Sequence, residues 1–449
     1  LFAPIVISFL DLGRTLSIEV RPMRLKIKKK MKREKKIKRE TTKKSILFFT
    51  HYFPYPDRPG SSRPWVEANI LKDLGYKVIV ITSGVDYLTG ESEMGWRLFK
   101  REKRNGIKVI KVATISRYRQ STFRRALHYF VYSMMAFFAA LFQKKPDKIF
   151  LATASYFITF WFFLYKLIRA RDVKFVLDER DMTLESFVAL GILKRRVKFF
   201  FLRRWDGFVR KRADRVITIS EGMKKYLIGQ GVTQSKIEVI PNIDIELMTK
   251  DIEQDYREPR NSFYGKEGFV VMYTGSFGMA NDVFTILKAA EYLDKICANI
   301  GFILIGTGEK LGYYKEYIKN KNIGNTMIMD GLPREKTRKF LYNADICLHA
   351  LRKDKPWAAS LSSKIFDYLL FKKPIVYSGE GEIKDLIEES GAGVCVEAEN
   401  PNELAKGIMD LCSSRQELRA MGEKGERYVR DHYTKEGIYE AFRKIFLEK

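Results

Sequence analysis

The residues best suited to chemistry lie in one stretch, SSKIFDYLLFKKPIVYSG, which runs from Ser362 to Gly379. The spacing of its apolar residues predicts a short helix that begins near Ser363, followed by a buried strand. Ser363 and Asp367 share a helix face, and Lys364 lies beside Asp367 on the next turn. A helix N-terminus binds phosphate through its free N–H groups and its dipole, and a carboxylate further along can accept hydrogen bonds from a ribose diol. Taken alone, the pattern fits a capped surface helix with solvated charges equally well.

Loops of small residues follow several predicted strands in the same half of the chain. These strands are 270–274, 302–305 and 327–330. The carboxyl ends of parallel strands meet at one edge of a sheet, where α/β proteins bind their ligands, so the loops favour a nucleotide crevice between two domains. The residues predicted to bind this nucleotide are Gly275, Ser276, Gly306, Gly308, Asp330, Gly331, Ser362, Ser363, Lys364 and Asp367.

Strands and helices also alternate in the first half of the chain. The predicted strands there are 46–50, 78–82, 174–177 and 216–220. Unbroken alternation of this kind predicts an α/β fold. The first strand-to-helix turn contains Pro59, Gly60 and Ser61 in place of G-x-G-x-x-G, which argues against a dinucleotide-binding domain. Small residues in this turn still let a substrate approach the backbone.

Charged residues follow the 174–177 strand, from Asp178 to Asp181, with Glu185 shortly after them. Charges at the carboxyl end of a parallel strand face the ligand crevice. We therefore expect a second substrate to be positioned at this edge. The residues predicted to do so are Gly60, Ser61, Arg63, Arg180, Asp181 and Glu185.

Composition limits the class of protein. The chain of 449 residues suits two or three domains, and its formal net charge of +28 favours nucleic acid, anionic lipid or a phosphorylated substrate as partner. The four cysteines have no C-x-x-C spacing and are typical of reduced thiols in a cytosolic protein. The four histidines are far apart in the sequence, so we expect no metal site and no cofactor.

The composition changes along the chain at several points. We expect a basic disordered extension over 1–44, a first domain over 45–243, a linker over 244–267, a second domain over 268–420, and C-terminal helices over 421–449 that pack back on the first domain. Residues 21–44 hold 14 lysines and arginines against two glutamates. A run like this is usually solvated, and Met23 or Met31 could be the true start; the alternative is a tether to anionic lipid.

Two uncharged runs, 126–143 and 149–165, lie in the first domain. Each is shorter than the roughly 20 residues that a transmembrane helix needs, and we expect a helix over 122–143, a strand over 148–153 and a helix over 155–169. Such helices are ordinarily the cover of a parallel sheet. Their aromatic residues and basic flanks favour contact with a membrane surface instead. The aromatic residues are Phe137, Phe138, Phe160, Trp161, Phe162 and Phe163, and the flanks are Arg117, Arg119, Arg124, Arg125, Lys144 and Lys145.

Residues 45–449 resemble family 4 of the retaining glycosyltransferases. The segments that carry the resemblance are HYFPYPDRPGSSR, LDERDMTLESFVALGILK, ADRVITISEGMKKYL, VIPNID, YTGSFG, LIGTGEK, DGLPREK and SSKIFDYLLFKKPIV. The resemblance implies the GT-B architecture of two Rossmann-like domains facing each other across a cleft. The segment RDMTLESFVALGILK is similar to a subgroup that builds surface polysaccharides on polyprenyl-diphosphate carriers.

The resemblance also implies an activity. A sugar moves with retention from a nucleotide-diphosphate donor, UDP-linked in our prediction, to a glycan or lipid-linked acceptor, without metal. The enzyme is expected in the cytoplasm at the inner face of the membrane, with no nucleic acid as partner. Arg180, Asp181, Lys364 and Asp367 are then the predicted catalytic residues, with Lys364 stabilising the leaving diphosphate and Asp367 binding the ribose. The residues expected at the edge of the first domain, Glu185 among them, are predicted to position both the acceptor and the transferred sugar.

Several positions depart from the family's pattern. The first of two glutamates, which touches the donor sugar, corresponds to Ala359, and the second to Asp367. The family's arginine and lysine after the first strand of the second domain correspond to Ser276 and Asn281. Its central histidine corresponds to Arg180, and the glycine of P-N-G-I-D is Ile243.

Two other classes of function stay open at this point. A GT-B epimerase would need several carboxylates and histidines in the cleft, which are scarce in this sequence. A non-enzymatic nucleic-acid binder would need its basic residues in one stripe on a face without a cleft.

Overall fold

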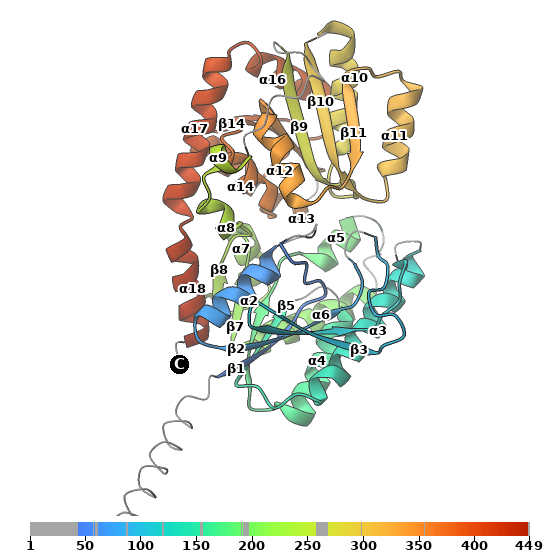
Figure 1. Cartoon of the computed structure of the whole chain (residues 1–449), viewed down its shortest axis with the longest axis vertical. Coiled ribbons are helices and arrows are strands. Elements are labelled where there is room, and N and C mark those ends of the chain that lie inside the picture. Colours follow the sequence, from blue (N-terminus) through green and yellow to red (C-terminus); the bar gives the residue numbers. More distant parts are fainter. Residues whose placement is uncertain are drawn as a thin grey trace, which may run out of the picture. The chain divides into compact units, whose positions relative to one another are not determined.

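The computed structural model describes residues 44–447 apart from 57, 59–61, 87–88, 119–120, 153–155, 190, 192–196, 257–267, 298 and 354. The predicted basic extension therefore lies outside the described residues except for Lys44. Residues Ser45–Lys449 form one compact unit. Within this unit the described strands form two separate sheets, which we call the sheets of the first and the second lobe (Figure 1).

The first lobe contains an eight-stranded sheet with the order β3-β4-β2-β1-β5-β6-β7-β8. All neighbouring strands are parallel except β3 and β4, which form an antiparallel hairpin at one edge. The chain leaves β1 for β2 on one side and reaches β5 on the other, so the strand order reverses between β1 and β5. The strands are β1 (Ser45–Phe49), β2 (Lys77–Ser83), β3 (Phe99–Arg104), β4 (Ile107–Val112), β5 (Lys148–Ala152), β6 (Lys174–Asp178), β7 (Arg215–Thr218) and β8 (Ile237–Val239).

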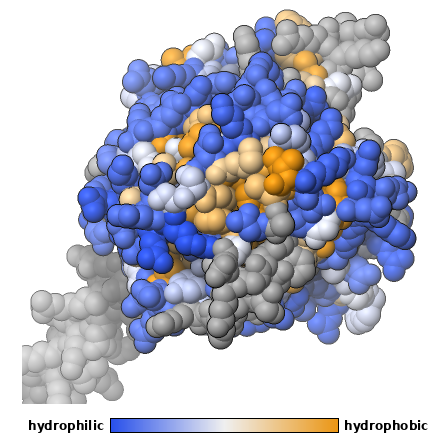
Figure 2. Space-filling model, turned by 90° about the horizontal axis from the view of Figure 1, so that it is seen from above, coloured by the Kyte–Doolittle hydropathy of each residue, from blue (hydrophilic) through white to orange (hydrophobic). Residues whose placement is uncertain are grey.

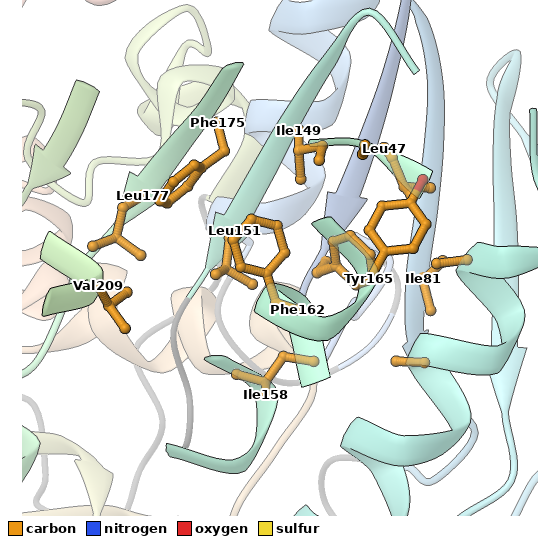
Figure 3. Close-up of a cluster of buried hydrophobic side chains, with 14 of the residues drawn as sticks. Leu47, Ile81, Ile149, Leu151, Ile158, Phe162, Tyr165, Phe175, Leu177 and Val209 are labelled. Atoms are coloured by element: carbon orange, nitrogen blue, oxygen red, sulfur yellow. The ribbon is translucent and has the colours of Figure 1, made fainter. Parts of the chain in front are cut away.

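Helices cover both faces of this sheet. Leu47, Leu151 and Phe175 of the strands pack with Phe162 and Tyr165 in one buried cluster, as Figure 3 shows. The opposite face packs against Trp65 and the C-terminal helix. The helices are α2 (Arg63–Asp73), α3 (Thr122–Leu141), α4 (Tyr156–Arg169), α5 (Thr183–Ala189), α6 (Val197–Arg212) and α7 (Glu221–Gly229).

The second lobe contains a six-stranded parallel sheet with the order β11-β10-β9-β12-β13-β14. This is a doubly wound order in which the chain reverses direction across the sheet between β9 and β12. A ligand crevice is expected outside the carboxyl ends of those two strands. The strands are β9 (Phe269–Ser276), β10 (Ile300–Thr307), β11 (Thr326–Asp330), β12 (Ile346–Ala350), β13 (Ile375–Ser378) and β14 (Gly393–Val396).

The helices of the second lobe pack against both faces of its sheet. Ile365, Phe366 and Leu369 of α14 are fully buried there, which accounts for the apolar spacing read from the sequence. The helices are α8 (Ile245–Met248), α9 (Ile252–Tyr256), α10 (Val283–Ile296), α11 (Leu311–Asn320), α12 (Arg334–Asn343), α13 (Lys355–Ala358), α14 (Ser363–Leu370), α15 (Glu382–Ser390), α16 (Pro401–Leu411) and α17 (Arg415–His432).

The last helix, α18 (Lys435–Leu447), packs on the first lobe against α2 (Figure 1). Phe442 and Phe446 belong to the buried cluster of the first lobe, and the Tyr76 hydroxyl donates to the Phe446 carbonyl at 2.5 Å. The preceding helix α17 packs on α14 of the second lobe. The boundary expected at residue 420 therefore falls inside one continuous helix, because α17 runs from Arg415 to His432.

The α/β fold class and the division into two sheets are confirmed. The expected linker differs in part, because Leu247 and Tyr256 of the short helices α8 and α9 are buried in the second lobe; its residues 257–267 lie outside the described residues. The sequence analysis did not predict the β3–β4 hairpin or α6. It also took Phe137 and Phe162 as surplus apolar surface, which is wrong, because both are buried in the first-lobe core.

Candidate functional site

The first turn of α14 lies at the point where the strand order of the second sheet reverses. Lys364 projects from this turn to the carboxyl end of β9. A Cβ atom added to Gly275 would lie only 2.4 Å from the Lys364 Nζ atom, so glycine is needed for the ammonium to lie there. Gly275 also has a φ of 141°, which other residues rarely adopt.

Lys364 has neutral neighbours in place of a carboxylate. Its Nζ atom lies 3.4 Å from the Tyr273 hydroxyl and 3.4 Å from Asn281 Oδ1, and 4.6 Å from the centre of the Tyr273 ring. No carboxylate among the described residues forms an ion pair with it. Burial lowers the pKa of the Lys364 ammonium to about 7. A cation in this situation gains stability from any anion that enters the site.

Asp367 lies one turn further along α14 and belongs to a group of charged side chains that does not include Lys364. Its Oδ2 atom is 3.7 Å from Arg334, whereas Oδ1 is buried and has no hydrogen-bond partner within the described part of the chain. Burial raises the pKa of Asp367, and Arg334 and Arg338 partly offset that effect. Lys364 and Asp367 therefore do not pair with each other, although their sequence spacing allowed it.

Asp244 completes this second charged group. It forms ion pairs with Arg338 and, at 3.3 Å, with Arg334. Burial alone would raise the pKa of Asp244, but the two guanidinium groups outweigh it and the pKa is lowered. Asp244 thus holds both arginines beside Asp367, and leaves the Oδ1 atom of Asp367 available for a hydroxyl donor.

The predicted glycine loops bring backbone close to backbone. A Cβ atom at Gly306 would lie 1.8 Å from the Gly275 carbonyl oxygen, and one at Gly308 would lie 2.5 Å from the Phe277 backbone. These glycines therefore pack the β9 and β10 loops together at the carboxyl edge. Ser276 is exposed at the end of β9.

The other residues predicted to bind the nucleotide lie at the end of β11 and at the start of α14. Asp330 is exposed and pairs with Lys315 at 2.9 Å, with Gly331 directly after it. Ser362 is the N-cap residue of α14, but its side chain makes no capping hydrogen bond, and Ser363 begins the helix. The backbone N–H groups of this helix terminus are thus not capped by the Ser362 hydroxyl.

The first lobe contains a buried cluster of four charged side chains. Arg63 Nε lies 2.7 Å from Glu67 and Arg63 Nη2 lies 3.2 Å from Asp178. Arg180 also contacts both acids, at 2.5 Å to Asp178 and 2.9 Å to Glu67. Arg63 additionally donates to the Ile240 carbonyl at 2.7 Å. We call these four residues the first-lobe ion cluster.

This pairing changes the interpretation of two predicted acceptor residues. Arg63 is 4% exposed and Arg180 is held by two acids, so both guanidinium groups are tied into the protein. Burial and the nearby Asp178 raise the pKa of Glu67 to about 7, against the opposing effect of both arginines. Asp181 is exposed beside the cluster, whereas Gly60 and Ser61 lie outside the described residues.

Glu185 lies apart from the cluster, on α5, in a cavity of about 540 Å³ that residues of both lobes line. Contacts between the lobes occur nearby. The Ser220 hydroxyl donates to the Ala359 carbonyl at 2.6 Å, and the Gly222 backbone N–H donates to Glu382. The sequence analysis missed Glu382, Asp244, Arg334 and Arg338, although the PNID and PREK segments that contain Asp244 and Arg334 had been singled out.

No cluster of three or more metal-binding side chains occurs in the part of the chain that the structure describes.

Two doubly wound sheets, parallel apart from the β3–β4 hairpin, are the arrangement of the GT-B class. Residues 67–243 match the model of the glycosyl transferase 4-like domain, and residues 256–428 match that of glycosyl transferases group 1. The chain is thus a GT-B glycosyltransferase that combines these two domains in this order.

Similar proteins agree with this assignment. An uncharacterized glycosyltransferase of Methanocaldococcus jannaschii is 22% identical over 312 residues, which make up 69% of this chain and 77% of that protein. The sucrose-phosphate synthase of Thermosynechococcus elongatus superposes with a TM-score of 0.68 at 15% identity, covering 90% of this chain and 99% of that chain. Anabaena HepE in complex with UDP-glucose gives a TM-score of 0.64 at 15% identity, covering 89% and 98%.

Proposed function

We propose that the protein transfers a sugar, with retention, from a UDP-sugar to a glycan or polyprenyl-diphosphate-linked acceptor. The observation that carries this proposal is the pair of unsatisfied groups on α14. Lys364 is a partly buried ammonium without a carboxylate partner among the described residues, and one buried oxygen of Asp367 has no hydrogen-bond donor there. A nucleoside diphosphate supplies an anion to the first and a ribose diol to the second.

The choice of UDP over other nucleotides draws on a structural neighbour. HepE was solved with UDP-glucose and shares the fold over most of both chains. The family matches of both lobes favour a transferase over the epimerase alternative. We therefore assign the donor nucleotide to the second lobe and the acceptor to the first.

The chemistry follows from the position of Lys364. The bond between the sugar and the diphosphate breaks, and the Lys364 ammonium and the N-terminus of α14 stabilise the charge that develops on the leaving phosphate. Retention follows if the acceptor oxygen attacks from the face that the phosphate leaves, and the phosphate oxygen takes the acceptor proton. With a protein cation at this position, the proposed transfer needs no metal.

The test is hydrolysis and transfer with purified protein and a panel of UDP-sugars, in the presence and absence of EDTA. We expect UDP release from at least one sugar nucleotide, unaffected by EDTA, and a product with the anomeric configuration of the donor by NMR. Inversion at the anomeric carbon would reject the retaining mechanism. Dependence on an added divalent cation would reject metal independence.

The acceptor site is assigned to the carboxyl edge of the first sheet. Asp181 belongs to this assignment, as do Gly60 and Ser61, which lie outside the described residues, whereas Glu185 lines a separate cavity. For Arg63 and Arg180 we propose an indirect role, since their ion pairs fix the loop that carries Asp181. Substitution of Asp181 by alanine is expected to raise the KM for the acceptor, with the KM for the donor unchanged.

We also propose that the first lobe contacts the cytoplasmic face of a membrane. The helices α3, α4 and α6 adjoin one another, and Phe142 is 75%, Phe160 56% and Phe201 64% exposed. The sequences of these helices contain one acidic residue, Asp206, and many basic ones. Exposed aromatic rings among basic residues suit anionic lipid. Another face, shown in Figure 2, is mainly hydrophilic with one apolar band.

None of the described helices is both long enough and apolar enough to cross a bilayer. The proposed contact is therefore tested by flotation of a chain that begins at Ser45 with liposomes. We expect binding to anionic vesicles that weakens at high salt, and weaker binding of a Phe142→Ser, Phe201→Ser variant. A chain that stays in solution under every condition would indicate a soluble acceptor.

A further inference from the structure

A cavity of about 540 Å³ draws its wall from both lobes. The first lobe contributes Glu185 of α5, Phe199 of α6 and Tyr226 of α7, and the second lobe contributes Pro356 and Ala359. The Ser220 hydroxyl donates to the Ala359 backbone at 2.6 Å and so holds the second-lobe wall against α7. The volume lies within the usual range for a small-molecule site.

Glu185 is the acidic residue among those that line this wall. Burial raises the pKa of the Tyr226 hydroxyl. The neighbouring Glu185 adds to this increase, whereas Arg210 opposes it. The Oε2 atom of Glu185 is buried and has no hydrogen-bond partner among the residues that the structure describes. A buried acceptor without a donor is unfavourable by about 1–3 kcal/mol, so this oxygen is preorganised for a ligand that donates.

The remainder of the wall suits a ring with one apolar face. Phe199 and Tyr226 supply aromatic surface, and Arg203 lies over the Phe199 ring and donates to Gln230 at 3.2 Å. The small side chain of Ala359 leaves space in the part of the wall that the second lobe supplies. A pyranose presents C–H groups on its faces and hydroxyl donors around its edge, which matches aromatic walls with one carboxylate.

We propose that this cavity holds the sugar that is transferred, and that Glu185 determines donor specificity by accepting hydrogen bonds from its hydroxyl groups. The transferred sugar is favoured over the acceptor because it alone must lie between the lobe that binds the nucleotide and the lobe that binds the acceptor. This inference rests on the proposed function, since it presupposes a nucleotide-sugar donor. Ala359 then provides space, and the polar contact comes from the first lobe.

The test compares the affinities of wild-type protein and Glu185→Gln for UDP, UDP-glucose and UDP-glucuronate by calorimetry. Loss of the carboxylate should weaken UDP-glucose binding by about 10- to 100-fold. The affinity for UDP should not change, because UDP lacks the sugar. UDP-glucuronate should bind the variant more tightly than it binds wild type, because a like charge has been removed. A merely structural role would not produce this gain.

Two further variants control for a general loss of structure. Tyr226→Phe removes the hydroxyl that orients Glu185, so it should weaken UDP-glucose binding several-fold in the wild-type background and not in Glu185→Gln. Glu316→Gln, an exposed carboxylate on α11, is the matched control and should change no affinity.

The outcomes separate the inference from the proposed function. If wild type binds UDP-glucose and Glu185→Gln binds it equally well, the inference is overturned and the donor assignment stands. If only the KM for the acceptor changes, the cavity belongs to the acceptor and the inference is likewise overturned. If wild type binds UDP and none of the UDP-sugars, the proposed donor and the inference both fail.

Discussion

The first-lobe ion cluster and the α14 site use the same kinds of side chain in opposite ways. In the cluster, each of the two arginines contacts both acids at distances from 2.5 to 3.2 Å. At the α14 site, Lys364 has two neutral partners at 3.4 Å, and one oxygen of Asp367 has no donor in the described part of the chain. Satisfied charges fix a structure, whereas unsatisfied ones are kept for a ligand.

This difference indicates which charges to assign to stability and which to binding. Breaking one member of a buried ion pair leaves an uncompensated charge and is strongly destabilising. Removing a buried charge that has no partner costs the folded protein little and costs ligand binding more. Substitutions in the two regions should therefore separate into two classes.

The largest expected effect is on stability, from Arg63→Ala. Among the described residues, its removal leaves Arg180 as the ion-pair partner that Glu67 and Asp178 share, and the free energy of unfolding should fall by about 3–5 kcal/mol. Urea denaturation followed by circular dichroism measures this change. Arg58→Ala, which breaks the exposed pair with Asp86, is the control and should cost less than about 1 kcal/mol. An Arg63→Ala protein of unchanged stability with impaired binding would assign the cluster to ligand contact.

The next effect is on turnover, from Lys364→Ala. Loss of the group that stabilises the leaving diphosphate should lower kcat by about 10²- to 10³-fold, by analogy with a lost oxyanion donor. The midpoint of thermal unfolding should not fall, because no carboxylate among the described residues loses an ion-pair partner. Steady-state UDP release measures the change, and Lys384→Ala, on the exposed face of α15, serves as the control. Unchanged kcat would remove Lys364 from the mechanism.

A smaller effect is expected on nucleotide affinity, from Asp367→Ala. Loss of charge-assisted hydrogen bonds to the ribose should raise the Kd for UDP by about 10- to 100-fold. Calorimetry on the variant gives this value, with Asp410→Ala, at the exposed end of α16, as the control. An equal loss of affinity for UDP and for inorganic diphosphate would show that Asp367 acts through the phosphate site.

The smallest effect is a dependence on pH. The pKa of Lys364 is about 7 in the free protein, and a bound diphosphate favours the charged form and so raises it. Above pH 7 the protein must therefore take up a proton to bind, and affinity for UDP should fall by up to about 10-fold per pH unit. Lys364→Arg, which stays charged, should abolish this dependence. A pH-independent Kd for wild type between pH 7 and 9 would contradict the lowered pKa.

Much of this fold could be predicted because its apolar periodicity is strong. The strands ending at Gly275, Gly306 and Asp330, and the helix starting at Ser363, lie within a few residues of their predicted positions. The helix α6 was missed because its basic and apolar residues are mixed. The β3–β4 hairpin was missed because β3 is mostly charged.

The site was less predictable than the fold, because pairing is decided by tertiary contacts. The sequence spacing of Lys364 and Asp367 suggested a shared face. Their actual partners, Tyr273 and Arg334, come from other elements of the second lobe. Likewise, nothing local to Arg63 indicates that Asp178 and Ile240 enclose it. The contacts of Arg63 join segments that are 115 and 177 residues apart in the sequence.

The path of the C-terminal helices restricts relative motion of the lobes. The chain passes from the first sheet to α8 after residue 240, and it returns from α17 to α18 at residues 433–434. Segments Ile240–Pro241 and His432–Thr434 line one cavity, so the two crossings are neighbours. A rigid body attached at two points keeps a single rotational freedom, about the line through them. The lobes can thus rotate about this line, and because Ser220 and Glu382 line the same cavity as the two crossings, their contacts with Ala359 and Gly222 lie close to the axis.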